Sequence, residues 1–327
     1  MSTQSQRLAL ALTIAFAALA PASQTLAQNY PNRTIRIVVP YAPGGGVSVY
    51  AHLIANKLGE IVKQTVVVEN RPGAGGNVGA DVVAKSPPDG YTVLLHTAAM
   101  ASAGPMYKSL AFDPAKDFAP VTQVVATQMI VAGSLKYQAT TLRELVADAK
   151  TRPSKLNYAS SGLGSSLHLF AEIFKTSAGL DIVHIPYRGD APMITAMIAG
   201  DVQMAFLPQA TGQAVVQDGR ARALAVTGRK RFPQLPNTPT LMELGIKGFE
   251  DGSWTGMWMP AGTPPGIVSA FQQAMAKVLA DPMVAGRFRS LGAEPVGSTP
   301  AEFTAFFKAD IARYAKVIEQ AKIPKLD

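Results

Sequence analysis

Short runs of β-branched residues, each followed by a glycine-rich loop and a helical pattern, recur along this chain and constrain its fold more than any other feature. Residues 35–39 predict a strand, which leads into the loop Pro43–Gly46 and a helix over 49–58. Residues 65–69 predict a second strand, followed by a loop with glycines at 73, 75 and 76. Strands alternating with helices at this spacing indicate an α/β protein whose parallel or mixed sheet is covered by helices.

The middle of the chain repeats this pattern. Further strands are predicted at residues 92–95, 129–132, 157–159, 182–185, 204–207 and 223–226, with helices around 82–84 and 193–198 and a capping box at Thr141–Glu144. A chain of 327 residues favours two lobes over one core. Because no low-complexity linker separates them, the chain is expected to cross between the lobes more than once.

The last part of the chain is predicted to be helical. One helix starts at Thr263-Pro264-Pro265, and another at the capping box Thr299–Glu302. The second helix carries one apolar stripe, which predicts that it packs on a core. The stripe is formed by Phe303, Phe307, Ile311, Tyr314 and Ile318. Before these helices, Trp254 and Trp258 alternate with methionines, which favours a packed crossover strand over the alternative of ligand stacking.

The first 27 residues have the features of a secretory signal. Arg7 precedes an apolar run, Leu8–Ala20, that is too short to anchor a protein stably in a bilayer, and Pro21 interrupts it. Thr25-Leu26-Ala27 is an acceptable cleavage site, so Gln28 is the expected mature start and a location outside the cytoplasm is expected. A membrane anchor is the alternative, although no later run is long and apolar enough to span a bilayer.

Composition narrows the possible functions. The chain has no cysteine, which excludes thiolate catalysis, cysteine zinc sites and disulfides. Its formal net charge of +8 is scattered, apart from Arg229–Arg231. Scattered charge favours small anionic ligands weakly, whereas nucleic-acid binding needs a clustered basic stripe or aromatic platforms. Nucleic acid is therefore not an expected partner.

The glycine-rich loops do not match nucleotide-binding motifs. In G-x-G-x-x-G, the third glycine position counted from Gly162 is Leu167, and from Gly73 it is Val78. Gly-Lys-Ser/Thr is absent, as are a G-x-S-x-G nucleophile elbow and an HExxH helix. His52, His96 and His184 each stand alone in the sequence, and no carboxylate pair stands out in the loops. No cofactor, metal or enzymatic activity is expected.

With these functions disfavoured, anion binding is the function predicted for the stretch YASSGLGSSLHLFAEIF at residues 158–174. Its small and polar residues lead into a helix, whose first N–H groups have no intrahelical acceptor and lie at the positive end of the helix dipole. Ser160, Ser161, Ser165 and Ser166 can add hydroxyl donors. Serine before a helix is also a common N-cap, so both roles stay open for Ser165, and capping is favoured for Ser166. His168 is expected on the helix face, either packed or lining a cleft.

Several long motifs resemble the extracytoplasmic substrate-binding receptors of tripartite tricarboxylate transporters, also called the Bug family. The matching stretches are YPNRTIRIVVPYAPGGG, VVVENRPGAGGNVGADVVAKSPPDGYTVLL, YASSGLGSSLHLFAEIF, VHIPYRGDAP, RARALAVTGRKRFPQLPNTPTLMELG and WMPAGTP. The resemblance implies a two-lobed periplasmic binding protein of type II with a ligand cleft between the lobes. Lobe 1 is expected to comprise residues 28–127 plus 253–327, and lobe 2 residues 128–252.

The resemblance also implies a function and a site. Family members bind carboxylates and deliver them to a membrane permease of two subunits, although orphan receptors without a permease are common; a monomer is the default. The carboxylate is held largely by backbone and hydroxyl groups of two loops, here Tyr41–Ser48 and Ser160–His168. The expected ligand-binding residues are Tyr41, Pro43, Gly44, Gly45, Gly46, Ser48, Thr97, Ser160, Ser161, Gly164, Ser165, His168 and Leu207.

The chain departs from the family pattern at several positions. The first loop usually ends in Thr-Asp with Arg four residues later, where this chain has Val47-Ser48 and His52. Gly104 replaces a frequent Asn in the loop after the third strand, and Leu207 replaces a common acidic residue. Fewer polar groups disfavour amino-acid ligands and favour a less polar acid, aromatic or short aliphatic. A measured preference for aspartate or glutamate would defeat this hypothesis.

Two other functions compete with transport. A receptor of the same fold can feed a sensor or signalling partner, in which case deletion would abolish regulation and leave uptake intact. An exported hydrolase is disfavoured by the missing nucleophile elbow and carboxylate pair.

Overall fold

The computed structural model describes residues 30–44, 46–187, 189–249, 252–320 and 322–327. The predicted signal peptide lies outside the described residues, so its cleavage after Ala27 stays a prediction. Within the described ranges, no helix combines the length and apolar character needed to cross a membrane.

Helices and strands alternate along most of the chain. The strands are β1 (Ile35–Val39), β2 (Val66–Asn70), β3 (Thr92–Thr97), β4 (Phe118–Thr127), β5 (Met129–Ser134), β6 (Asn157–Ser160), β7 (Val183–Pro186), β8 (Met204–Pro208), β9 (Ala221–Val226), β10 (Ser253–Pro260) and β11 (Ala293–Pro295). The helices are α3 (Gly46–Val62), η1 (Ala74–Gly76), α4 (Asn77–Ala84), α5 (Ala99–Met106), α6 (Leu142–Thr151), α7 (Ser166–Ala178), α8 (Asp190–Ala199), α9 (Gln209–Gln217), α10 (Pro265–Ala280), α11 (Pro282–Ser290) and α12 (Pro300–Gln320).

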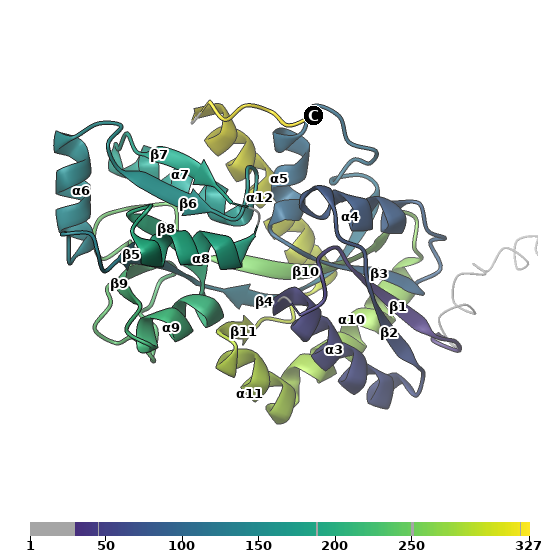
Figure 1. The fold of residues 1–327 in the computed structure, drawn as a ribbon. Coiled ribbons are helices and arrows are strands. Elements are labelled where there is room, and N and C mark those ends of the chain that lie inside the picture. Colours follow the sequence, from purple (N-terminus) through teal and green to yellow (C-terminus); the bar gives the residue numbers. More distant parts are fainter. Residues whose placement is uncertain (1–29, 45, 188, 250–251, 321) are drawn as a thin grey trace, which may run out of the picture.

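These elements form two sheets, one at the centre of each of two lobes that lie side by side (Figure 1). The six-stranded sheet has the order β11-β4-β10-β3-β1-β2, and the five-stranded sheet has the order β7-β6-β8-β5-β9. The two-lobed α/β fold and the repeated crossing are therefore confirmed, because the first sheet takes strands from both sides of the second in the sequence. This division supports the lobe limits at 127/128 and 252/253, which remain a proposal.

The first sheet is buried on both faces, as mixed sheets with helices on each side are. Ile37 and Val39 pack in one core with α3 and α10, whereas Val38 packs in another with α4, α5 and α12. β10 follows the same two-residue period. Its tryptophans are 0–1% exposed and face α12, which confirms the packed strand. The stripe of α12 packs on this core as well, as predicted.

Several elements escaped the sequence analysis. β4 was missed because Pro120, Thr122 and Gln123 break its apolar pattern, and its pairing with β10 shifts register twice. Gly104 and Pro105 were expected in a loop but lie inside α5, a buried helix that packs on α12. This packing overrides the local preference of both residues against helix. α9, α11 and β11 were also not predicted.

The two chain crossings between the lobes lie against each other. Gly252 has φ +59°, and a Cβ added there would lie 2.4 Å from the carbonyl oxygen of Thr127. Only glycine accepts both this backbone conformation and this close approach without strain. The residues on either side of the crossings are thereby held close together.

Candidate functional site

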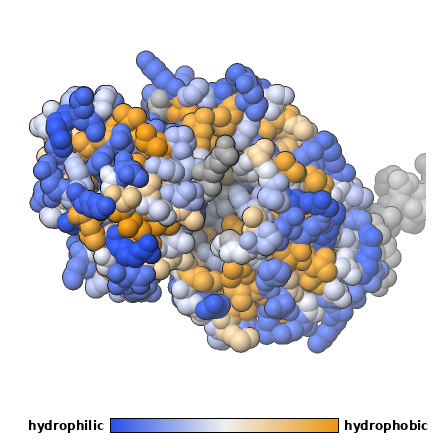
Figure 2. All heavy atoms as spheres, viewed as in Figure 1, coloured by the Kyte–Doolittle hydropathy of each residue, from blue (hydrophilic) through white to orange (hydrophobic). Residues whose placement is uncertain are grey.

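The two predicted loops follow the carboxyl ends of parallel strands, which is where open α/β sheets bind ligands. β1 is parallel to β2 and β3 and leads into the first loop. β6 is parallel to β7 and β8 and leads into the second. Figure 2 shows that the face of the molecule is hollowed between the two lobes. The fold therefore supplies one loop from each lobe beside an open region.

Side chains from the ends of the neighbouring strands fix the first loop. Asn70 Nδ2 donates to the carbonyl oxygen of Tyr41 at 2.8 Å and to Ser48 Oγ at 3.3 Å. The Tyr41 hydroxyl lies 2.7 Å from Thr97 Oγ1 and 3.2 Å from His96 Nδ1. Asn70, Thr97 and His96 end β2 and β3, so the sheet register brings these groups to Tyr41.

His96 forms the floor beneath the first loop and is 1% exposed. A Cβ added at Gly76, where φ is +107°, would lie 2.4 Å from His96 Nε2, so this glycine leaves room for the imidazole. Burial lowers the pKa of His96 to about 4 and raises the pKa of Tyr41 to about 12. Both side chains are therefore neutral at pH 7.

The tip of the first loop leads directly into α3 with an exposed backbone. Pro43, Gly44 and Gly46 are exposed, Gly44 has φ +85°, and Gly45 lies outside the described residues. The first N–H groups of a helix lack acceptors within that helix and lie at its positive end. Gly46 and Val47 of α3 therefore present donors suited to an anion.

The second loop is capped by Ser165. Its Oγ accepts a hydrogen bond from the N–H of His168 at 3.2 Å, and its backbone is extended, as at an N-cap. The preference for Ser166 as the cap was wrong, since Ser166 is already the first residue of α7. The first-turn N–H groups of Ser166 and Leu167 are thus free of intrahelical acceptors.

Other backbone donors of this loop are used within it. Gly162 N–H donates to Ser160 Oγ and Gly164 N–H donates to His168 Nδ1, both at 3.2 Å. The N–H of Ser165 donates to the carbonyl oxygen of Gly162 at 3.2 Å. A ligand would therefore find the α7 first turn and the hydroxyls of Ser161 and Ser165, rather than the glycine N–H groups.

The predicted site residues thus separate into two groups. Those that are at least partly exposed are Tyr41, Pro43, Gly44, Gly46, Thr97, Ser161, Gly164 and Ser165. Ser48, Ser160, His168 and Leu207 are 0–3% exposed. Leu207 lies in β8 opposite Ile130, within the core of lobe 2. Ligand contact by any of these residues stays a prediction, and the buried four are placed behind the surface.

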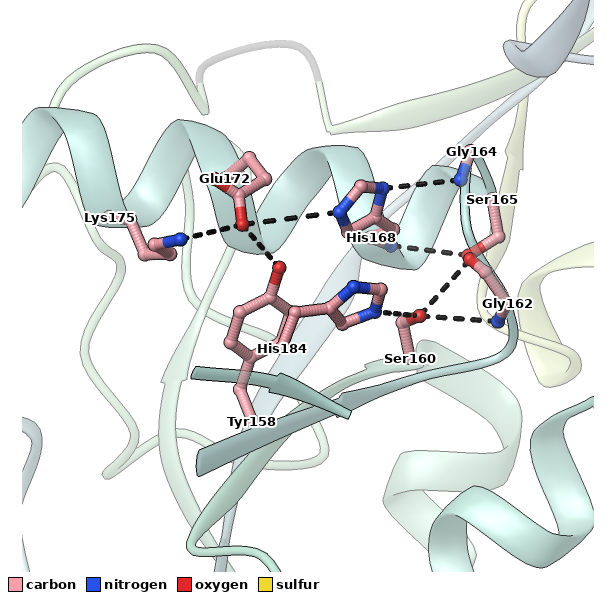
Figure 3. A network of polar contacts seen from close by, with 9 residues as sticks. All are labelled: Tyr158, Ser160, Gly162, Gly164, Ser165, His168, Glu172, Lys175 and His184. Atoms are coloured by element: carbon pink, nitrogen blue, oxygen red, sulfur yellow. Dashed lines mark hydrogen bonds and ion pairs between the residues drawn. The ribbon is translucent and has the colours of Figure 1, made fainter. Parts of the chain in front are cut away.

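His168 and His184 form a stacked pair behind the second loop, with ring centroids 4.1 Å apart (Figure 3). His184 stands alone in the sequence, but β7 lies beside β6 and brings it under α7. Its Nε2 lies 2.6 Å from Ser160 Oγ, and its ring also stacks on Tyr158 at 4.9 Å. The packed alternative for His168 is therefore the one observed.

A buried carboxylate lies next to this pair. Glu172 accepts hydrogen bonds from the Tyr158 hydroxyl and, at 2.8 Å, from Lys175 Nζ. His168 Nε2 lies 4.0 Å from the same carboxylate oxygen. Burial lowers the pKa of both His168 and His184 to about 4, with a smaller contribution from the Lys175 charge. Both imidazoles are neutral at pH 7.

One acidic side chain lies beside the second loop. Asp190 begins α8, and a hydrogen bond from Ser161 partly offsets the burial that raises the pKa of its carboxyl. This carboxylate could not be assigned to the loop from the sequence, because 28 residues separate Ser161 from Asp190. Asn70, His96 and His184 were missed too, although their positions at or near strand ends could have identified them.

The site has donors suited to an anion. No group of three or more His, Cys, Asp or Glu side chains able to hold a metal occurs in the described ranges. The nearest serine–histidine pair, Ser160 and His184, is covered by the loop, and Ser160 is 0% exposed. The geometry can hold and release a small anion.

Two α/β lobes with a loop from each beside an open hollow define a solute-binding protein of the periplasmic binding protein class, and solved periplasmic binding proteins share the fold. Residues 50–323 match the tripartite tricarboxylate transporter family receptor, TctC. The chain belongs to this family of periplasmic solute-binding receptors, as its motifs predicted.

Individual relatives agree over nearly the whole chain. BugT of Bordetella pertussis is 33% identical over 316 residues, covering 96% of this chain and 97% of BugT. The structure of Rpa4515 from R. palustris with adipate has a TM-score of 0.82 and 36% identity, covering 91% of this chain and 100% of that one. MatC from Rhodopseudomonas palustris with bound malate has a TM-score of 0.78 and 28% identity, covering 88% and 100%.

Proposed function

We propose that this receptor captures a small organic carboxylate between its two loops and does no chemistry on it. The observation that carries the proposal is the pair of helix starts, α3 and α7, whose first-turn N–H groups follow the loops from the two lobes. Neither Tyr41–Ser48 nor Ser160–His168 contains Lys or Arg. Partial charges at helix starts and hydroxyls attract a carboxylate without holding it as a full cation would.

The ligand is proposed to be a less polar acid, aliphatic or aromatic. The Tyr41 ring and Pro43 line the first loop, and Leu163 at the tip of the second is 41% exposed. Apolar surface of this kind suits a hydrocarbon body between or beside carboxylates. The adipate bound by Rpa4515 has this chemistry, which supports the proposal for this chain.

Asp190 supports a second candidate, an acid that also carries an ammonium or hydroxyl group. A carboxylate beside Ser161 repels an anion but pairs well with a donor. Malate, which is bound by MatC, carries such a hydroxyl. Binding by amino acids and hydroxy acids is therefore tested alongside the simple acids.

A thermal shift screen of residues 28–327 tests the proposed function. The panel is adipate, benzoate and nicotinate, then malate, aspartate and glutamate, with adipamide as the uncharged control. A ligand at about one hundred times its Kd adds roughly 2.7 kcal/mol to the free energy of unfolding, which raises Tm by several degrees. We expect shifts with adipate or an aromatic acid and none with adipamide. A preference for aspartate or glutamate would reverse the ligand class, and no shift with any acid, after refolding to remove carried-over ligand, would contradict carboxylate binding.

The partner is proposed to be a two-subunit membrane permease of the tripartite tricarboxylate type. Ligand bound by both lobes stabilises a closed state, which a permease can distinguish from the open one. Deletion of the gene should abolish uptake of the acid identified in the screen. Intact uptake with lost induction of a response to that acid would indicate a sensor partner instead.

A further inference from the structure

We propose that the stacked pair His168 and His184 positions the second ligand loop without touching the ligand, by holding Ser160 and Gly164 from behind. The proposal rests on the proposed function, in which this loop contributes to carboxylate binding. It changes the role expected for His168, from ligand contact to positioning, and gives a role to His184.

His184 holds the strand end from which the loop departs. Its Nε2 lies 2.6 Å from Ser160 Oγ, which in turn accepts from Gly162 N–H at 3.2 Å. The same hydroxyl lies 3.1 Å from the carbonyl oxygen of Gly162. The single hydroxyl proton of Ser160 can be donated either to the Gly162 carbonyl oxygen or to His184 Nε2, but not to both. If the hydroxyl donates to Gly162, the contact with His184 needs a donor, and His184 in its Nε2–H form can supply it. Ser160 thereby connects the imidazole to the first turn of the loop.

His168 holds the other end of the loop. Gly164 N–H donates to its Nδ1 at 3.2 Å, so Nδ1 carries no proton and the ring proton is on Nε2, which faces Glu172. Gly164 has φ +77°, and an added Cβ would lie 3.0 Å from Leu326 and 3.1 Å from Met106. The loop is thus fixed by an imidazole on one side and by lobe 1 side chains on the other.

The surrounding groups favour the neutral pair. Glu172 is 5% exposed and is already paired with Lys175 and Tyr158, which leaves little capacity to stabilise an imidazolium. The two rings are 4.1 Å apart, so one charge opposes a second. A proton on His168 Nδ1 would also face the Gly164 N–H, donor against donor. Loop order therefore requires that His168 stays neutral.

The first test is NMR of ¹⁵N-histidine-labelled wild-type protein. The chain has four histidines, and single variants assign them. We expect His168 in the Nε2–H form at pH 7 and no titration of either ring above pH 5. Titration of His168 near pH 6.5, or a proton on Nδ1 at pH 7, would overturn the proposal.

The second test compares variants that keep or remove the hydrogen bonds. His168→Phe and His184→Phe keep a ring for stacking, whereas His168→Asn keeps an acceptor near Nδ1 and His184→Gln keeps a polar group near Nε2. We expect the Phe variants to speed amide exchange at Gly162 and Gly164 by about fivefold, the effect of a lost hydrogen bond of average strength. The conservative variants should restore most of the protection.

Affinity for adipate provides the functional readout. The Phe variants should raise Kd by about tenfold, and the conservative variants by less than about threefold. Phe174→Leu is the control, because Phe174 is a buried ring of the same helix that packs on Phe206 away from the loop. It should lower Tm without changing Kd or Gly164 exchange. If a Phe variant does not fold, the positioning role is tested by the corresponding conservative variant, His168→Asn or His184→Gln, together with the NMR titration of wild-type protein.

The outcomes separate the two proposals. Failure of adipate and every other acid to bind wild-type protein would contradict the proposed function, while amide exchange still tests positioning. Acid binding by wild type with unchanged exchange and Kd in the Phe variants would contradict the positioning role alone. Weaker binding in the Phe variants that matches the loss seen in Phe174→Leu would assign the histidines to stability only.

Discussion

The two ligand loops are both supported by imidazole side chains, but the imidazole contacts differ. Each places polar backbone beside a hollow with neutral imidazole behind it. In lobe 1 this is the buried His96, and in lobe 2 it is the pair formed by the buried His168 and the half-buried His184. In the first loop, the imidazole contacts a side chain, Tyr41, and the tip backbone is exposed. In the second, the imidazole accepts directly from the loop backbone at Gly164.

This difference predicts different weaknesses. The first loop depends on close packing around His96, because the imidazole occupies the space that a side chain at position 76 would need. The second loop depends on hydrogen bonds whose acceptor disappears when His168 is protonated. Steric changes should therefore affect mainly the first loop. Protonation of His168 should disturb the second loop directly, beyond the loss of stability that protonation of His96 also causes.

The largest expected effect is a loss of stability in mild acid. The pKa values of His96, His168 and His184 lie near 4, below the usual 6.5, so the unfolded state binds more protons between these values. The free energy of unfolding should therefore fall as pH is lowered from 6.5 towards 4, by about 1.5 kcal/mol between pH 6.5 and 5 for each of the buried imidazoles His96 and His168. Urea unfolding at both pH values measures this.

Variants assign this pH dependence to the lobes. His96→Asn should remove the lobe 1 share, and His168→Asn part of the lobe 2 share. Equal stability of wild type at pH 6.5 and 5 would contradict the account of neutral buried imidazoles.

A methyl group at Gly76 should come next in size. Gly76→Ala adds a Cβ 2.4 Å from His96 Nε2 at a residue with φ +107°, so both a clash and backbone strain result. We expect a loss of about 2–4 kcal/mol in urea unfolding. Gly44→Ala is the matched control, with φ +85° and nothing within 4 Å, and should cost about 1–2 kcal/mol. Equal losses would show that His96 does not limit the space.

Removal of the Tyr41 hydroxyl tests the side-chain contact of the first loop. Tyr41→Phe loses the 2.7 Å hydrogen bond with Thr97 and should cost about 1 kcal/mol of stability. It should also weaken binding of the screened acid, measured by calorimetry. Tyr50→Phe is the control, a buried tyrosine whose ring packs edge-on against Phe288 with centroids 5.3 Å apart, and it should leave Kd unchanged. Unchanged affinity in Tyr41→Phe would remove this hydroxyl from the site.

The smallest expected effect concerns Asp190. Asp190→Asn removes a negative charge beside Ser161, so adipate should bind up to about fivefold more tightly at pH 7, consistent with an interaction below 1 kcal/mol near the surface. Malate or aspartate should gain less or bind more weakly. Tighter binding of aspartate than of adipate by the variant would contradict the assigned role of the carboxylate.

The sequence predicted local features well because their causes are local. The helix caps at Thr141 and Thr299 form as expected, with the hydroxyl of each accepting from the N–H of the glutamate three residues later. At Thr299 the Glu302 carboxylate accepts from the Thr299 N–H in return, whereas Glu144 accepts from the N–H of Thr140. The family motifs also predicted the two-lobed fold. β4 and α5 were missed or misassigned because their stability comes from β10 and α12, which are far away in the sequence.

The sequence predicted which loops form the candidate site, but it did not predict which of their side chains are exposed and which are buried. Ser160 and Ser161 are adjacent in sequence, yet one is fully buried and the other partly exposed. The pairing of β6 with β7 places His184 under Ser160. The separation of residues 160 and 184 in the sequence does not indicate that the two side chains are in contact. Which loop groups face a ligand and which face an imidazole is therefore a tertiary property.

The most direct test of the central claim is a crystal structure of the mature protein with the acid that gives the largest thermal shift. We expect the ligand between the lobes, with carboxylate oxygens about 3 Å from the first-turn N–H groups of α3 or α7 or from the hydroxyls of Tyr41, Thr97, Ser161 or Ser165. His168 and His184 should stay behind the loop without ligand contact. A carboxylate bound directly by either imidazole, or bound outside the two loops, would contradict it.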